Sequence, residues 1–320
     1  ISLALPHRKT KRNERSISQF ATLCSNLLFR YVFILSCSEN VRKRDDAYVL
    51  FRFYEIPQRD RADSISINTN TQSAVKARDL RSNSKQILKL KKAYEAKYSN
   101  GFFATKRGEI IPADKDKQYC IELSYLGKNL TAWYMQRPNL SYGETKIFDK
   151  YFNTLFKNDY LPEDAYALSF WMRKIMDAWT QENPLGLEEE LLTMKAYAPY
   201  HLLFAISMVF AKCNNQTNVP SPSECLKVAS ENNLVDSIIN IAANCLNSAI
   251  SAEKNNCEQN NRSFIPQNWV KNKSCNAGIM SAIQNYFSFL PTMNKEMDSK
   301  LKNGVKIDSK YFSYRVQAED

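Results

Sequence analysis

The pattern of apolar and polar positions predicts a small strand-forming region followed by a long helical region. The stretch AYVLFRFYEI, residues 47–56, is rich in β-branched and aromatic residues, and Val49, Phe51 and Phe53 share one face. This alternation predicts a β-strand. Residues 1–20 have a basic cluster and no clear period, so we expect them to be exposed and mobile.

An amphipathic helix is predicted between residues 83 and 100. Apolar positions recur there at helical spacing, at Ile87, Leu90, Tyr94 and Tyr98. A second face of the same helix carries a basic stripe, formed by Lys85, Lys89 and Lys92.

The ends of this helix are marked by capping residues. Asn83 followed by Gln86 is typical of an N-terminal cap, and Asn100-Gly101 is a typical stop. The stretch GFFATKRGEII, residues 101–111, then predicts a strand, a tight turn at Gly108 and a second strand.

Beyond about residue 118 the pattern is helical. Helices are predicted over residues 161–179 and from the capping box at Ser221 to about Ile250, with a polar loop over 251–263 and fraying from Lys300. We therefore predict an α+β fold, with a small sheet and a basic amphipathic helix in the N-terminal third and a mainly α-helical C-terminal part. The predicted domains are a basic α/β part, residues 1–118, and a helical part, residues 119–320.

Charge is distributed unevenly between these two parts. The chain has a formal net charge of +11 over 320 residues, but residues 1–110 hold 22 basic and 10 acidic side chains, and residues 111–320 hold 22 and 23. The whole excess lies in the first third, which favours a polyanionic partner there. The apolar runs 27–37 and 201–211 are too short to span a bilayer, so no membrane partner is expected.

The eight cysteines form no Cys-x-x-Cys pair, and the two histidines, His7 and His201, lie far from any cysteine cluster. This excludes the usual zinc spacings. In a chain of this size the pattern indicates reduced thiols and a cytoplasmic location. It identifies no cofactor.

No complete catalytic constellation appears in the sequence, so enzyme activity stays undecided. Glu95-Ala96-Lys97 has the Glu-x-Lys spacing of metal-dependent nucleases, with Asp79 as a partner, but it falls in the predicted helix rather than on a strand. His201 lies in an apolar helical run, where a core histidine is expected. Because Ile1 is not a natural start residue, we expect a longer protein, and a nuclease would need residues preceding Ile1.

The polar stretch INTNTQSAVKARDLRSNS, residues 67–84, directly follows the strand region. Amide side chains at Asn70 and Gln72 can read base edges, and Arg78 and Arg81 can grip guanine or phosphate. Alternatively, the amides bracket backbone groups in a turn and Arg78 pairs with Asp79. Residue chemistry alone favours this second interpretation.

The order of four elements in this region resembles the abortive infection phage resistance (AIPR) family of bacterial proteins. These elements are Asn70 and Gln72, then Arg78-Asp79-Leu80, then Phe102-Phe103, then the basic turn Lys106-Arg107-Gly108-Glu109. The resemblance covers about residues 47–112 well and residues 145–156 weakly. It implies a role in phage defence beside restriction-modification systems in the bacterial cytoplasm.

We therefore predict a phage-defence protein that binds nucleic acid, DNA or RNA, through its basic N-terminal part. The predicted contact residues are Asn70, Gln72, Arg78, Asp79, Arg81, Lys85, Lys89, Lys92, Lys106 and Arg107. One alternative is a non-catalytic module whose helical part binds a protein partner. Another is the C-terminal fragment of a metal-dependent nuclease.

Overall fold

The computed structural model describes residues 2–5, 49–52, 76–156, 160–180 and 182–317. Contacts divide the chain into two compact units, residues 1–69 and 70–320. In the first unit, β1 (Ser2–Leu5) pairs antiparallel with β2 (Val49–Arg52), so that Ser2 lies opposite Arg52. The predicted strand is confirmed at β2. Residues 1–20 are predicted to be exposed and mobile, and within them residues 2–5 form a strand that pairs with β2.

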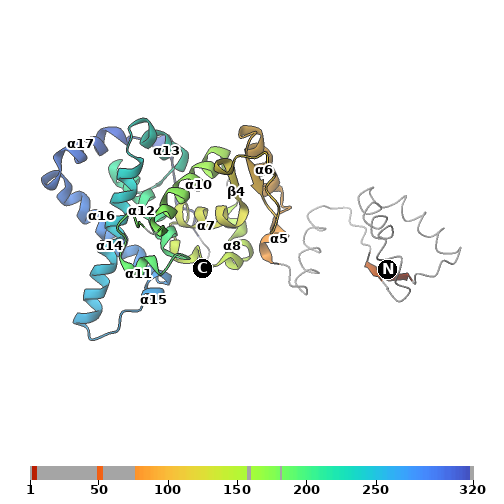
Figure 1. Ribbon diagram of the computed structural model, residues 1–320, viewed down its shortest axis with the longest axis horizontal. Helices are drawn as coiled ribbons and strands as arrows, with labels where there is room; N and C mark the ends of the chain where they lie inside the picture. Colours follow the sequence, from red (N-terminus) through yellow and green to blue (C-terminus); the bar gives the residue numbers. More distant parts are fainter. Residues whose placement is uncertain (1, 6–48, 53–75, 157–159, 181, 318–320) are drawn as a thin grey trace. The chain divides into compact units, whose positions relative to one another are not determined.

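The second unit is mainly helical, and the α+β prediction is confirmed (Figure 1). Its helices are α5 (Ala77–Arg81), α6 (Lys85–Lys97), α7 (Leu123–Trp133), α8 (Glu144–Asp149), α9 (Phe152–Leu155), α10 (Pro162–Met176), α11 (Glu189–Leu192), α12 (Ala198–Cys213), α13 (Pro222–Glu231), α14 (Val235–Gln259), α15 (Pro266–Lys271), α16 (Lys273–Met293) and α17 (Lys295–Gly304). Its strands are β3 (Phe102–Ala104), β4 (Cys120–Glu122), β5 (Val219–Pro220) and β6 (Phe312–Ser313). The functional division at residue 118 stays a prediction.

Helix α12 forms the centre of the core. Its residues from Ala198 to Ser207 are all buried, and it packs against α7, α10, α14 and α16. An all-round apolar helix is expected to be enclosed in this way. His201 is fully buried within it, with Nδ1 3.1 Å from the carbonyl oxygen of Tyr197, and burial lowers the pKa of His201 to about 4. The prediction of a core histidine is confirmed.

Helices α5 and α6 lie at one edge of this unit in Figure 1. The buried face of α6 is the predicted one, with Ile87, Leu90 and Tyr94 in the core. The predicted cap is wrong, because the helix begins after Ser84 and no side chain caps it. Residues 82–84 close the preceding turn, where the N–H of Ser84 donates to the carbonyl of Arg81, so Asn83 lies outside the helix.

The predicted strand-turn-strand over residues 101–111 is only half right. Strand β3 forms, but its partner is β4, which runs parallel to it with Phe102 opposite Cys120. Gly108 has φ +71°, the left-handed conformation that a glycine adopts without strain, so the turn itself is confirmed. The chain does not fold back as a hairpin, because Glu109 bonds to the backbone of the turn, and Ile110 beyond it is 86% exposed.

Three predictions for the C-terminal part need correction. The helix from the capping box ends at Glu231, and a second helix runs from Val235 to Gln259, so most of residues 251–263 are helical and not a loop. The break falls where Asn233 adopts φ +53°, which asparagine tolerates. The cap itself is confirmed, because Ser221 accepts from the N–H of Glu224. Residues 301–317 do not fray, since β6 pairs with β5 and the N–H of Val316 donates to the carbonyl of Tyr134.

Two further predictions concern the cysteines and the membrane. All six cysteines in the described parts of the chain are free thiols, as expected. In the part of the chain that the structure describes, no helix is long and apolar enough to cross a bilayer.

Candidate functional site

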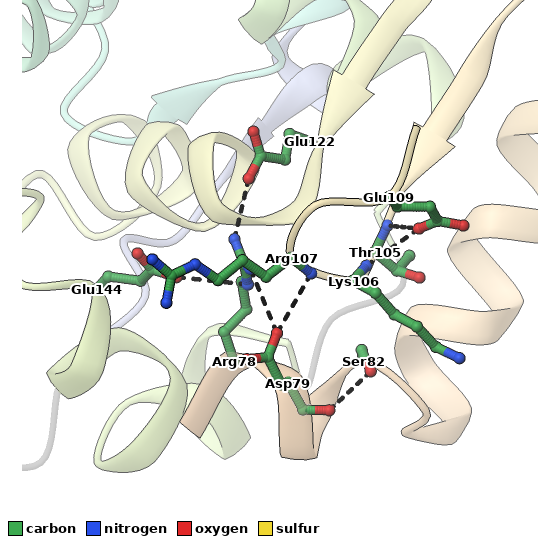
Figure 2. A network of polar contacts seen from close by, with 9 residues as sticks. All are labelled: Arg78, Asp79, Ser82, Thr105, Lys106, Arg107, Glu109, Glu122 and Glu144. Atoms are coloured by element: carbon green, nitrogen blue, oxygen red, sulfur yellow. Dashed lines mark hydrogen bonds and ion pairs between the residues drawn. The ribbon is translucent and has the colours of Figure 1, made fainter. Parts of the chain in front are cut away.

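Arg78, on the short helix α5, is the centre of a network of ion pairs (Figure 2). Its side chain is only 4% exposed and contacts three carboxylates. Nη1 lies 2.9 Å from Glu122, Nη2 lies 3.3 Å from Asp79, and Nε lies 3.5 Å from Glu144. The first two are hydrogen bonds, whereas the Glu144 contact lacks hydrogen-bond geometry. The guanidinium thus joins α5 to the end of β4 and to the start of α8.

The basic turn, which we define as residues Thr105 to Glu109, is held to this network by Asp79. The Oδ1 atom of Asp79 accepts a hydrogen bond from the backbone N–H of Arg107 at 3.3 Å while it contacts Arg78 (Figure 2). The alternative interpretation of the sequence, in which Arg78 pairs with Asp79, describes the geometry at this position.

Glu109 closes the basic turn from within. Its carboxylate accepts from the backbone N–H groups of Thr105 at 2.8 Å and Lys106 at 3.1 Å, and it contacts Lys91 Nζ at 3.2 Å. Burial would raise the pKa of Glu109, but the hydrogen bonds from Lys106, Thr105 and Lys91 outweigh it and hold the pKa below its usual value. The turn therefore carries an ionised carboxylate inside it at neutral pH.

The acidic residues near the basic turn are occupied in these contacts. Residues 76–110 contain ten basic and three acidic side chains, and the three acids are Asp79, Glu95 and Glu109. Asp79 contacts Arg78, whereas Glu95 and Glu109 both contact Lys91. Because each of the three acids contacts Arg78 or Lys91, none of them forms, among the described residues, an ion pair with the exposed side chains of Lys85, Lys92, Lys106 or Arg107.

The predicted basic stripe on α6 is exposed. Lys85, Lys89 and Lys92 lie at i, i+4 and i+7, the spacing of one helix face, and all three side chains are exposed. Lys106 and Arg107, in the basic turn, are exposed as well. These five cations are the predicted contact residues that the structure leaves accessible to a ligand.

Arg81 is placed differently from the other predicted cations. It is half-buried, its Nε donates to the carbonyl of Phe148 at 3.2 Å, and its guanidinium lies 4.7 Å from the centre of the Phe152 ring. Such a contact over an aromatic face stabilises packing of α5 on α8 and α9. Asn70 and Gln72 fall outside the described residues.

The Glu95-Ala96-Lys97 triplet lies on α6, as predicted, and its two charged side chains contact different residues. Glu95 accepts from the backbone N–H of Phe103 at 3.3 Å, and Lys97 pairs with Glu163 at 2.9 Å. No group of three or more His, Cys, Asp or Glu side chains suited to a metal ion occurs in the described parts of the chain.

Sequence reasoning missed Glu122 and Glu144, which complete the shell around Arg78. They lie 44 and 66 residues further along the chain, and no local pattern marks them as partners of Arg78. Their positions gave only a weak signal, since Glu122 is the last residue of a strand and Glu144 is the first residue of a helix.

The fold and this site define a mainly helical protein whose basic edge is built around a buried arginine. The protein-family comparison agrees with the resemblance in the sequence, since the model of the AIPR protein family matches residues 32–261. The chain belongs to the AIPR family. This membership supports a role in abortive infection and phage resistance. No curated protein and no solved structure matches the chain significantly.

Proposed function

We propose that this AIPR-family chain acts in phage defence by binding nucleic acid through its basic N-terminal part. The observation that carries the proposal is the charge arrangement of residues 76–110, in which all three acids are engaged with inward cations while Lys85, Lys89, Lys92, Lys106 and Arg107 face solvent. Exposed lysines and arginines supply the sequence-independent attraction to phosphates.

In this proposal some residues contact the nucleic acid and others hold the basic turn in position. Lys85, Lys89 and Lys92 contact phosphates directly, because their side chains are exposed on one helix face. Arg78 and Asp79 are positioning residues, since the first is buried among carboxylates and the second binds the backbone of the turn. The contacts predicted for Asn70 and Gln72 stay part of the proposal.

Fluorescence anisotropy with labelled oligonucleotides tests this function. The full chain is titrated into single-stranded RNA, single-stranded DNA and duplex DNA at about 50 mM salt, where phosphate contacts are strong. The proposal expects saturable binding to at least one of them. The triple variant Lys85→Gln, Lys89→Gln, Lys92→Gln should weaken binding about tenfold or more, because it removes three exposed charges. The absence of saturable binding to all three would overturn the proposal.

A matched control removes the same charge elsewhere. Lys295 and Lys300, on α17, and Lys306, just beyond its end, have exposed side chains in the C-terminal part. Their triple substitution by glutamine lowers the net charge equally, and binding should change by about twofold or less. Equal losses in the two triple variants would show that only the total charge matters.

The alternative of a protein-interaction module has one observation in its favour. Phe289 and Met293, on α16, are 61% and 81% exposed and border a hollow against α14. Large exposed apolar side chains often mark interaction sites. The nuclease alternative stays a prediction that depends on residues outside this sequence.

A further inference from the structure

A hollow of about 700 Å³ lies beside the basic turn, where the parallel strands β3 and β4 end. Ala104 and Glu122, the last residues of the two strands, line it, and the turn forms one wall through Lys106 and Glu109. Its volume falls in the range of roughly 300–1,000 Å³ that small-molecule sites have. Ligands of open α/β sheets bind at this end of parallel strands.

Two helices each present one face to the hollow. Along the start of α7, Glu122, Tyr125 and Asn129 line it at i, i+3 and i+7, the spacing of a single helix face. Helix α10 contributes a second face with the same periodicity: Ser169, Met172, Arg173 and Met176. The walls thus combine a tyrosine ring and methionine side chains with a few polar groups, the usual composition of a site for a flat organic ligand.

Asn129 gives the hollow an unused hydrogen-bond acceptor. The residue is only 2% exposed, and its Nδ2 donates to the carbonyl of Leu168 at 3.5 Å. Its Oδ1 has no hydrogen-bond partner among the described residues. Buried side-chain oxygens in native proteins are nearly always paired. A rotation of the amide would turn this enclosed oxygen into the hollow, where an N–H group of a ligand would supply the missing donor.

Two cations at the hollow, Lys106 and Arg173, have no ion-pair partner among the described residues, and the Arg173 guanidinium packs 5.8 Å from the centre of the Tyr166 ring. Arg173 also donates to the hydroxyl of Ser169 at 2.7 Å. Two of the lining carboxylates are occupied, because Glu122 binds Arg78 and Glu109 binds the turn and Lys91. Asp177 is the remaining acid at the hollow. This balance favours an anionic group such as a phosphate next to Lys106 and Arg173.

We infer that the hollow binds one nucleotide whose base carries an exocyclic amino group. The base lies against Tyr125 and Met172 and donates its amino N–H to Asn129 Oδ1, while the phosphate faces Lys106 and Arg173. The inference goes beyond the proposed function, because a free nucleotide would bind here whether or not the chain binds polynucleotides. The nucleotide can also be an unstacked unit of a single strand, and the experiment separates these two sources.

Isothermal titration calorimetry of the full chain provides the test. Each of AMP, CMP, GMP and UMP is titrated, together with ribose 5-phosphate. At least one of the three amino-bearing nucleotides should bind one-to-one, and UMP and ribose 5-phosphate should bind about tenfold more weakly, because they lack the exocyclic amino group that is assigned to Asn129. A short single-stranded oligonucleotide forms the second arm. Binding of the strand without binding of free nucleotides supports the strand-borne form, provided that the variants below weaken it.

Substitutions on α10 locate the binding. Met176→Trp fills the hollow and Arg173→Gln removes one of its two cations, and each should weaken binding about tenfold. Asn129→Leu should abolish the preference for amino-bearing bases. Lys174→Gln is the matched control, because Lys174 is the neighbour of Arg173 but lies 3.6 Å from Asp236, away from the lining residues. This control should bind as the wild type does.

Two results would overturn the inference. One is that neither the nucleotides nor the strand bind. The other is binding that is unchanged by both Met176→Trp and Arg173→Gln. If strand binding is lost in the Lys85, Lys89, Lys92 variant but survives in Met176→Trp, the strand-borne form of the inference is wrong, while the proposed nucleic-acid binding stands.

Discussion

The Oδ1 atom of Asp79 lies 3.3 Å from the backbone nitrogen of Arg107, 28 residues further along the chain. The same oxygen lies 3.3 Å from Nη2 of Arg78. One carboxylate therefore connects the Arg-Asp-Leu element to the basic turn, two of the elements on which the family resemblance depends. These two elements are separated in the sequence but are in contact in the fold.

Replacing Arg78 should destabilise the protein. Arg78→Met removes the cation from a shell of three carboxylates, Asp79, Glu122 and Glu144, and leaves them to repel one another. Because these partners are partly exposed, we expect a loss of about 2–3 kcal/mol in the free energy of unfolding. Urea denaturation measures it. Lys85→Met, which changes an exposed lysine of α6, should cost less than about 0.5 kcal/mol. Equal effects of the two substitutions would contradict the structural role of Arg78.

The basic turn should weaken in acid. The pKa of Glu109 is lowered in the folded state, so this carboxylate contributes stability at pH values above its unfolded pKa and loses that contribution as the pH falls through the folded pKa. Glu109→Gln should cost about 1–3 kcal/mol at pH 7. The difference between wild type and variant should shrink toward zero as the pH falls below the folded pKa of Glu109. A difference that is independent of pH would show that the charge of Glu109 is not what closes the turn.

The sequence predicts local features well where one face of an element meets the core. The apolar period of α6 identifies Ile87, Leu90 and Tyr94 as buried and leaves the lysine stripe exposed, since burial of apolar side chains dominates helix orientation. The turn at Gly108 was predictable for a similar reason, because a local conformational requirement selects glycine there.

Long-range pairing could not be predicted in the same way. The partner of β3 is β4 rather than residues 109–111. The carboxylate of Glu109 accepts a hydrogen bond from the backbone N–H of Thr105 within the turn, and the chain then continues to Cys120 before it pairs in parallel with β3. The partners of Arg78 arise in the same manner, since Glu122 and Glu144 come from distant elements that packing brings together. No spacing in the sequence encodes either contact.

His201 should make the free energy of unfolding depend on pH between its folded pKa of about 4 and its unfolded pKa of about 6.5. Its pKa is about 4 in the folded chain, against about 6.5 for an unperturbed histidine. Between these values the unfolded chain binds a proton that the folded chain does not, so stability falls as the pH falls. From pH 7.5 to pH 5, His201 should contribute a loss of about 2 kcal/mol. His201→Leu should reduce the measured pH dependence by that amount in urea denaturation, and an unchanged dependence would contradict the assignment.

Two helical glycines should respond oppositely to alanine. A Cβ atom at Gly127, on α7, would lie 2.8 Å from the Phe148 ring, whereas at Gly278, on α16, its nearest neighbour is Ala249 at 3.8 Å. Gly127→Ala should therefore destabilise the protein by about 1–3 kcal/mol through overpacking. Gly278→Ala should stabilise it by about 0.5–1 kcal/mol through helix propensity. Thermal melts of the two variants compare them directly, and a gain for Gly127→Ala would show that α7 and α8 pack less closely than described.

The salt dependence of nucleic-acid binding tests the central claim most directly. For the full chain, the logarithm of the association constant should fall linearly with the logarithm of the salt concentration, because each phosphate contact releases counterions. Removing Lys85, Lys89 and Lys92 together should make the slope shallower by about two units, while the matched variant at Lys295, Lys300 and Lys306 keeps the wild-type slope. Identical slopes for the wild type and the Lys85, Lys89, Lys92 variant would contradict the claim that the exposed face of α6 binds nucleic acid.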